Sequence, residues 1–369
     1  MTMRMDEKIN VRQFTLLLTL FTIGTSVLIT PSQIAAIAKE SAWIATTFSI
    51  IVGVLVLILF IYIGRLQPNL NLFQHNEYAF GKWIGKFITF IIVLYSIIGA
   101  STVLWTVGDF VIVQIIPQTP LTAVCILFMT IVIYGAKLGI ETIVKTVEIF
   151  FPWIIMLLTI IILFSIPSMD IKQLQPLWGQ PINKIVEASL YELSVSTFPL
   201  ILLFVLYPSV LNKDSKGTKS IIMGYLLAGS LIMAISVVAI TVLSYKLTSH
   251  YVYPTYVMAE RIEFIVLLDR LEVVIAISWI LSIFFKLFIY FYVSLIGISQ
   301  LLGLKHYRPI TLPIGIIVIG LALIVYPDTI FAGDWNKETW VPLSIAIGFV
   351  YPIVLLCGSK IKSFFKTGS

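Results

Sequence analysis

Five polar residues occupy every fourth position of the otherwise apolar stretch 271–302. They are Ser278, Ser282, Lys286, Tyr290 and Ser294. A helix turns once in 3.6 residues, so the five side chains form one slowly turning stripe. If this stretch crosses a bilayer, the lysine is about 22 Å from either end, too far for its ammonium to reach water. A charge there costs roughly 2.5–3.5 kcal/mol. Lys286 therefore either replaces a coupling cation beside a broken helix, or braces the protein against Asp109, Glu148, Glu187 or freed backbone carbonyls.

Two other segments combine small or hydroxyl residues with a proline. Gly24-Thr25-Ser26 precedes Pro31, and Ser194-Val195-Ser196-Thr197 precedes Phe198-Pro199. Proline has no N–H and glycine weakens a helix, so both segments are expected to free backbone groups. In a bilayer, freed groups are tolerated only where they line a cavity or meet a ligand. The matched pair predicts a binding site, although a simple proline kink is the alternative for each segment alone.

A further polar stripe runs along residues 84–114. It consists of Tyr95, Gly99, Thr102, Thr106 and Asp109. We expect Tyr95 to face the same cavity, whereas Gly99 and the threonines are alternatively small residues for close helix packing, the role we favour for Thr102. Glu187 and Glu192, together with Asp109, could make an outer vestibule acidic, but such residues are more often solvated.

The composition excludes a soluble fold. Of 369 residues, 59% are hydrophobic and 11% are charged, whereas soluble domains have about 45–50% hydrophobic and about 25% charged residues. The mean hydropathy is +1.04. A membrane-spanning helix needs about 20 mostly apolar residues. Ten such stretches are predicted, at 11–38, 42–64, 84–114, 121–137, 147–166, 185–210, 219–245, 271–302, 310–327 and 341–357.

Charge in the connecting segments predicts the orientation. If the N-terminus is cytoplasmic, sixteen of the 24 Lys and Arg residues lie on the cytoplasmic side of the membrane and seven on the outer side. Arg4 and Lys213 are among the sixteen. Both termini are then cytoplasmic. Five spans on each side of the outer segment 167–184 predict two inverted repeats, 1–166 and 185–369, in which spans 1 and 6 correspond. The amphipathic loop from Lys246 to Asp269 is expected either to cap the outer mouth or to anchor at the interface.

Several classes of function are not indicated. Cys125 and Cys357 lie in separate apolar stretches and are not expected to form a disulfide. The three histidines fall in connecting segments without a Cys/His cluster, so no metal or cofactor site is predicted. The sequence contains no Walker loop, H-E-x-x-H or G-x-S-x-G motif, so we expect no enzyme. The net charge of +6 is attributed to topology and anionic lipid, not to nucleic acid.

Short motifs along nearly the whole chain resemble those of one membrane family. They are Ile23-Gly24-Thr25 with Pro31, Ala42-Trp43, Phe80-Gly81-Lys82-Trp83-Ile84-Gly85, Gly139-Ile140-Glu141-Thr142, Phe151-Pro152, Gln175-Pro176-Leu177, Tyr253-Pro254-Thr255, the Trp279 to Tyr292 region and Tyr307-Arg308-Pro309. In this order and spacing the chain is similar to the B subunits of the nutrient germinant receptors of endospore-forming bacteria, the spore-germination branch of the amino acid/polyamine/cation transporter superfamily.

The resemblance implies an all-α, LeuT-like membrane fold of ten helices in a 5+5 inverted repeat, with helices 1 and 6 broken. It also implies a small germinant, an L-amino acid, bound mid-membrane between spans 1, 3, 6 and 8. The implied ligand-binding residues are Gly24, Thr25, Ser26, Tyr95, Gly99, Ser196, Thr197, Phe198 and Ser282. By the same resemblance, the protein works with receptor A and C subunits in the inner membrane of the spore and triggers germination.

Two other functions compete with this interpretation. A proton-coupled amino acid transporter of the plasma membrane would use Lys286 as a group that changes protonation during the cycle. Both hypotheses predict ligand binding, but only the transporter predicts uphill uptake. A purely structural membrane anchor would leave the paired breaks and the buried lysine without a purpose.

Overall fold

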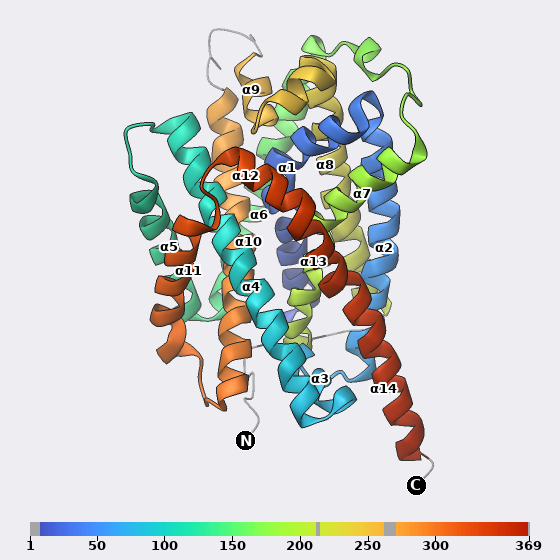
Figure 1. Ribbon diagram of the computed structural model, residues 1–369, viewed down its shortest axis with the longest axis vertical. Coiled ribbons are helices and arrows are strands. Elements are labelled where there is room, and N and C mark those ends of the chain that lie inside the picture. The colour runs from blue at the N-terminus through green and yellow to red at the C-terminus, as the bar shows by residue number, and fades with distance from the viewer. Residues whose placement is uncertain (1–7, 212–214, 262–270, 368–369) are drawn as a thin grey trace.

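The computed structural model describes residues 8–211, 215–261 and 271–367, and these form a bundle of helices (Figure 1). The helices are α1 Val11–Ala38, α2 Ala42–Leu66, α3 Leu72–Phe80, α4 Lys82–Phe110, α5 Leu121–Leu138, α6 Ile140–Ser165, α7 Ile182–Ser196, α8 Ser215–His250, α9 Pro254–Glu260, α10 Leu271–Leu302, α11 Thr311–Val325, α12 Thr329–Trp335, α13 Val341–Ile345 and α14 Tyr351–Thr367. Three π-helical segments extend or join them, at Val111–Ile115, Asn336–Trp340 and Ala346–Val350. The all-α fold class is confirmed.

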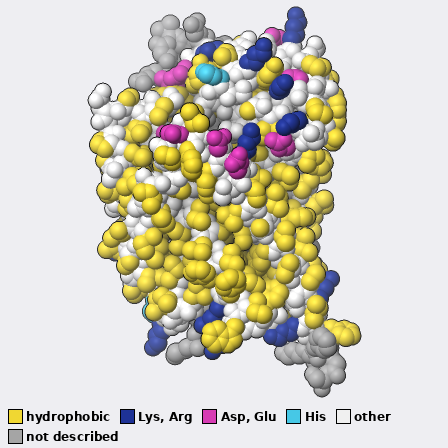
Figure 2. Space-filling view, in the orientation of Figure 1, with side chains coloured by type: hydrophobic (Ala, Val, Ile, Leu, Met, Phe, Trp, Pro, Cys, Tyr) yellow, Lys and Arg dark blue, Asp and Glu magenta, His cyan; other side chains and the backbone are white. Residues whose placement is uncertain are grey.

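Nine helical segments of the described chain are long and apolar enough to cross a membrane. The first of them, Val11–Leu66, contains both α1 and α2, so a total of ten spans stays a prediction. Hydrophobic side chains cover the middle of the molecule, while Lys and Arg gather towards its two ends (Figure 2). This belt is what a lipid-facing surface requires, because the hydrocarbon core of a bilayer cannot solvate charge.

Two predicted spans begin at least seven residues after the corresponding helical segments do. α6 begins at Ile140, not at 147, and the last helical segment begins at Thr329, not at 341. In the first case the charged residues Glu141 and Lys145 occupy the opening turns of the helix, and by composition this stretch is typical of a connecting segment. In the second, the polar run Asn336–Trp340 forms a π-helical turn inside the segment.

The start of α1 is tied to the end of the segment that follows α7, at one end of the bundle. Asn10 caps α1 by accepting a hydrogen bond from the backbone N–H of Gln13 at 2.8 Å, and the Gln13 side chain accepts from the Asn10 N–H at 3.0 Å. The short parallel strands β1 Ile9–Asn10 and β2 Val210–Leu211 then pair, with Ile9 opposite Val210. This pairing fixes the start of span 1 beside the end of span 6.

The backbone leaves α-helical geometry in both of these spans. Gly24 has φ 4° and ψ −100° within α1. α7 stops at Ser196, and after Thr197 the chain continues as the 3-10 helix Phe198–Val205. Both positions are those at which the sequence places a small, hydroxyl-rich stretch before proline.

The remaining sequence predictions have mixed outcomes. Cys125 and Cys357 are both free thiols, and among the described residues no group of three potential metal ligands occurs. The two-repeat division and the cytoplasmic location of the termini stay predictions. Arg4 and Lys213, and residues 262–269 of the predicted capping loop, lie outside the described residues.

Candidate functional site

Lys286 of α10 binds α1 beside its non-helical Gly24 and α7 near its last residue, Ser196. Its side chain is 1% exposed. The ammonium donates hydrogen bonds to Thr25 Oγ1 and to the carbonyl oxygen of Val195, both at 2.8 Å. In a continuous helix the Val195 carbonyl would accept from the N–H of residue 199, but Pro199 has none. The lysine therefore supplies the donor that the proline removed.

The stem of the lysine lies directly on Gly24. A Cβ atom at position 24 would be 2.5 Å from Lys286 Cδ and 3.0 Å from Lys286 Cβ. Glycine is therefore the one residue that lets α10 approach α1 this closely. The lysine Nζ is also 5.4 Å from the centre of the Phe21 ring, a distance at which an aromatic face attracts a cation.

The acids that the sequence offered as partners of Lys286 bind other groups. Asp109 accepts from the Tyr253 hydroxyl at 2.6 Å, Glu148 accepts from Gln13 Nε2 at 3.0 Å, and Glu187 pairs with Lys184 at 2.8 Å. Of the alternatives, a freed carbonyl is the one that the structure shows.

Glu192 of α7 corrects the expectation of a solvated acid. Its side chain is 2% exposed, and it lies beside the hydroxyl groups of Thr30 and Thr46, with the Lys286 charge near enough to act on it. Its Oε2 atom has no hydrogen-bond partner among the described residues. Glu192 is thus the buried carboxyl group on which the Lys286 charge acts, although no hydrogen bond joins the two side chains.

The carbonyl freed by the other proline is also occupied. Pro31 has no N–H for the Val27 carbonyl, and the Thr255 hydroxyl of α9 donates to that oxygen at 3.0 Å. The carbonyl groups that the two prolines leave without a helical donor therefore both accept from side chains in distant parts of the chain.

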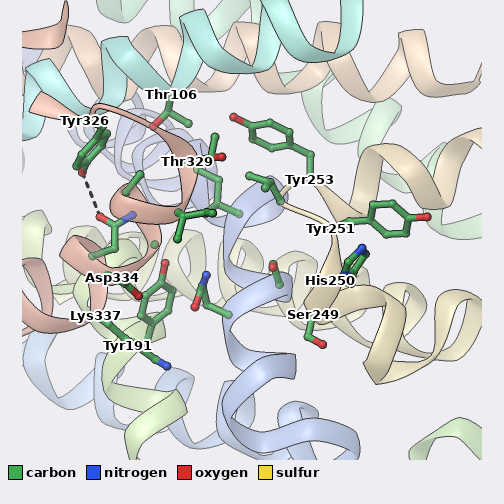
Figure 3. A pocket seen from close by; sticks show the side chains of 18 of the residues that line it. Thr106, Tyr191, Ser249, His250, Tyr251, Tyr253, Tyr326, Thr329, Asp334 and Lys337 are labelled. Carbon is green, nitrogen blue, oxygen red and sulfur yellow. Dashed lines mark hydrogen bonds between the residues drawn. The ribbon is translucent and has the colours of Figure 1, made fainter. Parts of the chain in front are cut away.

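A small cavity of about 50 Å³ adjoins Lys286, and we call it the central cavity. It is lined by Thr25, Ile29, Thr102, Val103, Thr106, Tyr191, Val195, Lys286, Tyr290, Tyr326, Asn336 and Trp340. A larger cavity of about 270 Å³, the vestibule, lies on the α9 and α12 side and shares Ile29, Thr106, Tyr191, Tyr326 and Asn336 with it. Figure 3 shows the vestibule, with Tyr191, Tyr253 and Tyr326 around it. The shared residues form the boundary between the two spaces, where the Tyr326 hydroxyl donates to Asn336 Oδ1 at 3.3 Å.

Only part of the predicted site lines the central cavity. Thr25 and Lys286 do, and so does Thr102, to which packing alone had been assigned. Gly24 supports the lysine from behind, and Gly99 makes room for the Tyr290 ring, whose carbon would lie 2.5 Å from a Cβ at that position.

Tyr95 lies one layer back from the cavity. Its ring stacks on Trp340 at 4.9 Å, and its hydroxyl group is 3.0 Å from Ser344 Oγ.

Five other predicted residues point elsewhere. Ser282 donates to its own helix at Trp279 O, 3.0 Å away. Thr197 Oγ1 is 2.7 Å from the Tyr225 hydroxyl and 3.1 Å from Ser196 Oγ, on the side of α7 that faces α8. The others are Phe198, which is buried against Phe349, and Ser26, whose buried Oγ has no partner among the described residues.

The last span and two tyrosines contribute cavity residues that the sequence did not predict. Trp340, Asn336, Tyr191 and Tyr326 all line the central cavity. Tyr191 and Tyr326 carry no local signal, because a single tyrosine in an apolar stretch is ordinary. For the last span a signal existed: Trp340, Ser344 and Gly348 recur every fourth residue, as the stripe around Lys286 does.

Comparison with known proteins decides the family. The family model described as "Spore germination protein" matches residues 8–330. The chain belongs to the spore germination protein family. Spore germination protein KB of Bacillus subtilis (strain 168) is 27% identical to this family member, and the alignment covers 94% of this chain and 93% of the relative. Spore germination protein XB of Bacillus anthracis is 24% identical, with 77% and 80% covered.

Solved structures agree on the fold of this spore germination protein. The crystal structure of MhsT in complex with L-phenylalanine has a TM-score of 0.72 at 12% identity, covering 96% of this chain and 99% of that one. The nucleobase-cation-symport-1 transporter MHP1, closed with bromovinylhydantoin bound, has a TM-score of 0.69 at 10% identity, with 95% and 79% covered. The LeuT-like membrane fold expected from the resemblance is therefore confirmed.

Proposed function

We propose that this chain is the ligand-binding membrane subunit of a nutrient germinant receptor, and that a small germinant, an L-amino acid, binds in the central cavity. The observation that carries the proposal is that Lys286 joins the non-helical parts of α1 and α7 at the edge of that cavity. Freed backbone groups beside a polar cavity inside a bilayer are the usual means of holding a small zwitterion.

The charges of the cavity fit such a ligand. The Lys286 ammonium uses two of its three donors on Thr25 and Val195, so one remains for a carboxylate. The carbonyl oxygens near the end of α7 offer acceptors for the ammonium of the ligand. A built-in cation at this place means that binding does not require a coupling metal ion.

The remaining parts of the proposal rest on the family. Membership supports work with receptor A and C subunits in the inner membrane of the spore, with ligand binding as the trigger of germination. A proton-coupled amino acid transporter is the second candidate. It is favoured by the transporter fold and by the position of Lys286 beside both breaks, where a change of its charge would release them.

The test is binding and uptake of radiolabelled amino acids by the purified protein in liposomes, with and without an inward proton gradient. A receptor subunit is expected to bind saturably without accumulation. Gradient-driven accumulation that Lys286→Met abolishes would instead establish a transporter. Lys305→Met, which removes an exposed lysine outside the spans, is the matched control.

The location of the site is tested by Gly24→Leu. Its side chain has no room beside Lys286, so binding is expected to be lost while the protein stays inserted. Gly320→Leu is the control, because nothing lies within 4 Å of a Cβ at position 320 of α11. Unchanged affinity in Gly24→Leu would remove α1 from the site.

A further inference from the structure

The last span contacts the broken part of α7 along one face. It is not a uniform helix, since the π-helical turns Asn336–Trp340 and Ala346–Val350 flank α13. Trp340 lies at one end of this face and Gly348 at the other. A Cβ at Gly348 would be 2.5 Å from Phe198 Cα, so the two backbones touch just beyond the end of α7. π-Helical turns of this kind are frequent at functional sites.

Trp340 is fixed by three independent contacts. Its indole N–H donates to the carbonyl oxygen of Ser194 at 3.1 Å, in the last turn of α7 where carbonyls lose their helical donors. Its ring stacks on Tyr95 at 4.9 Å with an interplanar angle of 11°, and it meets the edge of Tyr290 at 6.3 Å. With 6% of its surface exposed, the indole has no free rotamer to move into.

The indole also sets the size of the central cavity. The cavity holds about 50 Å³, whereas roughly 10–15 Å³ in the same measure holds one water molecule. A ligand that lies wholly within this space, without entering the vestibule, has only a few non-hydrogen atoms, about the size of glycine or alanine. Among the lining residues Trp340 has the largest side chain, and it lines the same cavity as the Lys286 ammonium that would hold a carboxylate.

We infer that Trp340 determines specificity by limiting the ligand to an amino acid with a very small side chain. The inference rests on the proposed function, since it assigns a ligand class to the same cavity. Trp340 fills the space that a longer side chain would need, and the Ser194 carbonyl keeps it there. Spans 1, 3, 6 and 8, between which the family resemblance implies the ligand site, thus hold the ligand. The last span determines which side chains fit.

The experiment measures the affinities of glycine, alanine, valine, leucine and phenylalanine for the purified wild-type protein, Trp340→Ala and Trp340→Phe. The wild type is expected to prefer glycine and alanine over leucine by at least about tenfold, because an apolar pocket discriminates 10- to 200-fold per methylene. Trp340→Ala should bind leucine or phenylalanine at least about tenfold more tightly than the wild type does. Trp340→Phe, which keeps an aromatic ring and is the milder change, should extend binding to valine.

Trp153→Ala is the matched control, because Trp153 is 57% exposed on the lipid-facing side of α6 and should leave the order of affinities unchanged. The same order in the wild type and in whichever Trp340 variant stays folded would overturn the inference but leave the proposed function standing. Failure of the folded wild type to bind any of the five amino acids would overturn the proposed function, and this inference with it.

Discussion

Replacing Gly24 by alanine should cost stability and ligand affinity together. The added methyl group would lie 2.5 Å from Lys286 Cδ and 3.0 Å from Lys286 Cβ, so the lysine stem must move away. Moving the Cβ of a buried residue requires a shift of α10 itself, and such overpacking typically costs about 1–3 kcal/mol. The ammonium then loses its fit to Thr25 and Val195, where each charged hydrogen bond is worth about 1.5–3 kcal/mol.

The assay is the free energy of unfolding in detergent, measured beside amino acid affinity. We expect a loss of about 2–4 kcal/mol and an affinity at least about tenfold weaker. In the double variant Gly24→Ala with Lys286→Met, the flexible methionine can yield to the methyl group, so the combined loss should be clearly smaller than the sum of the single losses. If Gly24→Ala behaves like Gly320→Ala, whose methyl group meets nothing within 4 Å, the close approach has no energetic role and the reasoning is refuted.

Three further changes test the surroundings of the site. Glu192→Gln removes the buried carboxyl group near Lys286 and should lower stability by about 2 kcal/mol, less than for a directly bonded pair, as measured by thermal unfolding. Tyr253→Phe removes the 2.6 Å donor of the buried Asp109 carboxyl group and should cost about 1.5–3 kcal/mol in chemical unfolding. Burial lowers the pKa of His75, in α3 outside the spans, from 6.5 to about 4. The unfolded chain then binds more protons between these values, so stability should rise on the order of 2 kcal/mol from pH 4 to 6.5, and a pH series on His75→Gln should flatten this rise.

Each of these variants has a matched control. Glu187→Gln breaks an ion pair whose side chains are 45% exposed, Tyr251→Phe changes a tyrosine two positions from Tyr253, and His306→Gln changes an exposed histidine. If the variant of a buried residue is as stable as its control, the role assigned to that residue is wrong. For His75, an unaltered slope between pH 4 and 6.5 would contradict the assignment.

Periodicity predicted the residues that must avoid lipid, but not which cavity each would face. Lys286 and Thr25 were identified because a charge and a broken helix are too costly in a bilayer to be incidental. Ser282 belongs to the same stripe as the lysine, yet it is satisfied by its own helix, which spacing alone does not reveal. A hydroxyl group can bond to the carbonyl one turn back, so it carries much less information than a charge.

The last span shows a different limit. Trp340 follows the polar run Asn-Lys-Glu-Thr, which by composition is a connection rather than a helix. The π-helical geometry that turns its indole towards α7 depends on contacts made by the assembled bundle. Likewise Glu192 was expected to be solvated because nothing in its neighbourhood in the sequence shows that α2 and α10 surround it.

The double attachment of Lys286 has a mechanical consequence. If α10 slides past α1 or α7, one of the two hydrogen bonds of Lys286 is stretched. As long as both bonds are intact, they therefore resist relative movement of the three helices. An incoming ammonium group that took the Val195 carbonyl would leave the Lys286 side chain bonded to α1 alone. Binding of a small molecule would in this way allow α10 and α7 to move relative to each other, because it breaks the hydrogen bond between Lys286 and Val195.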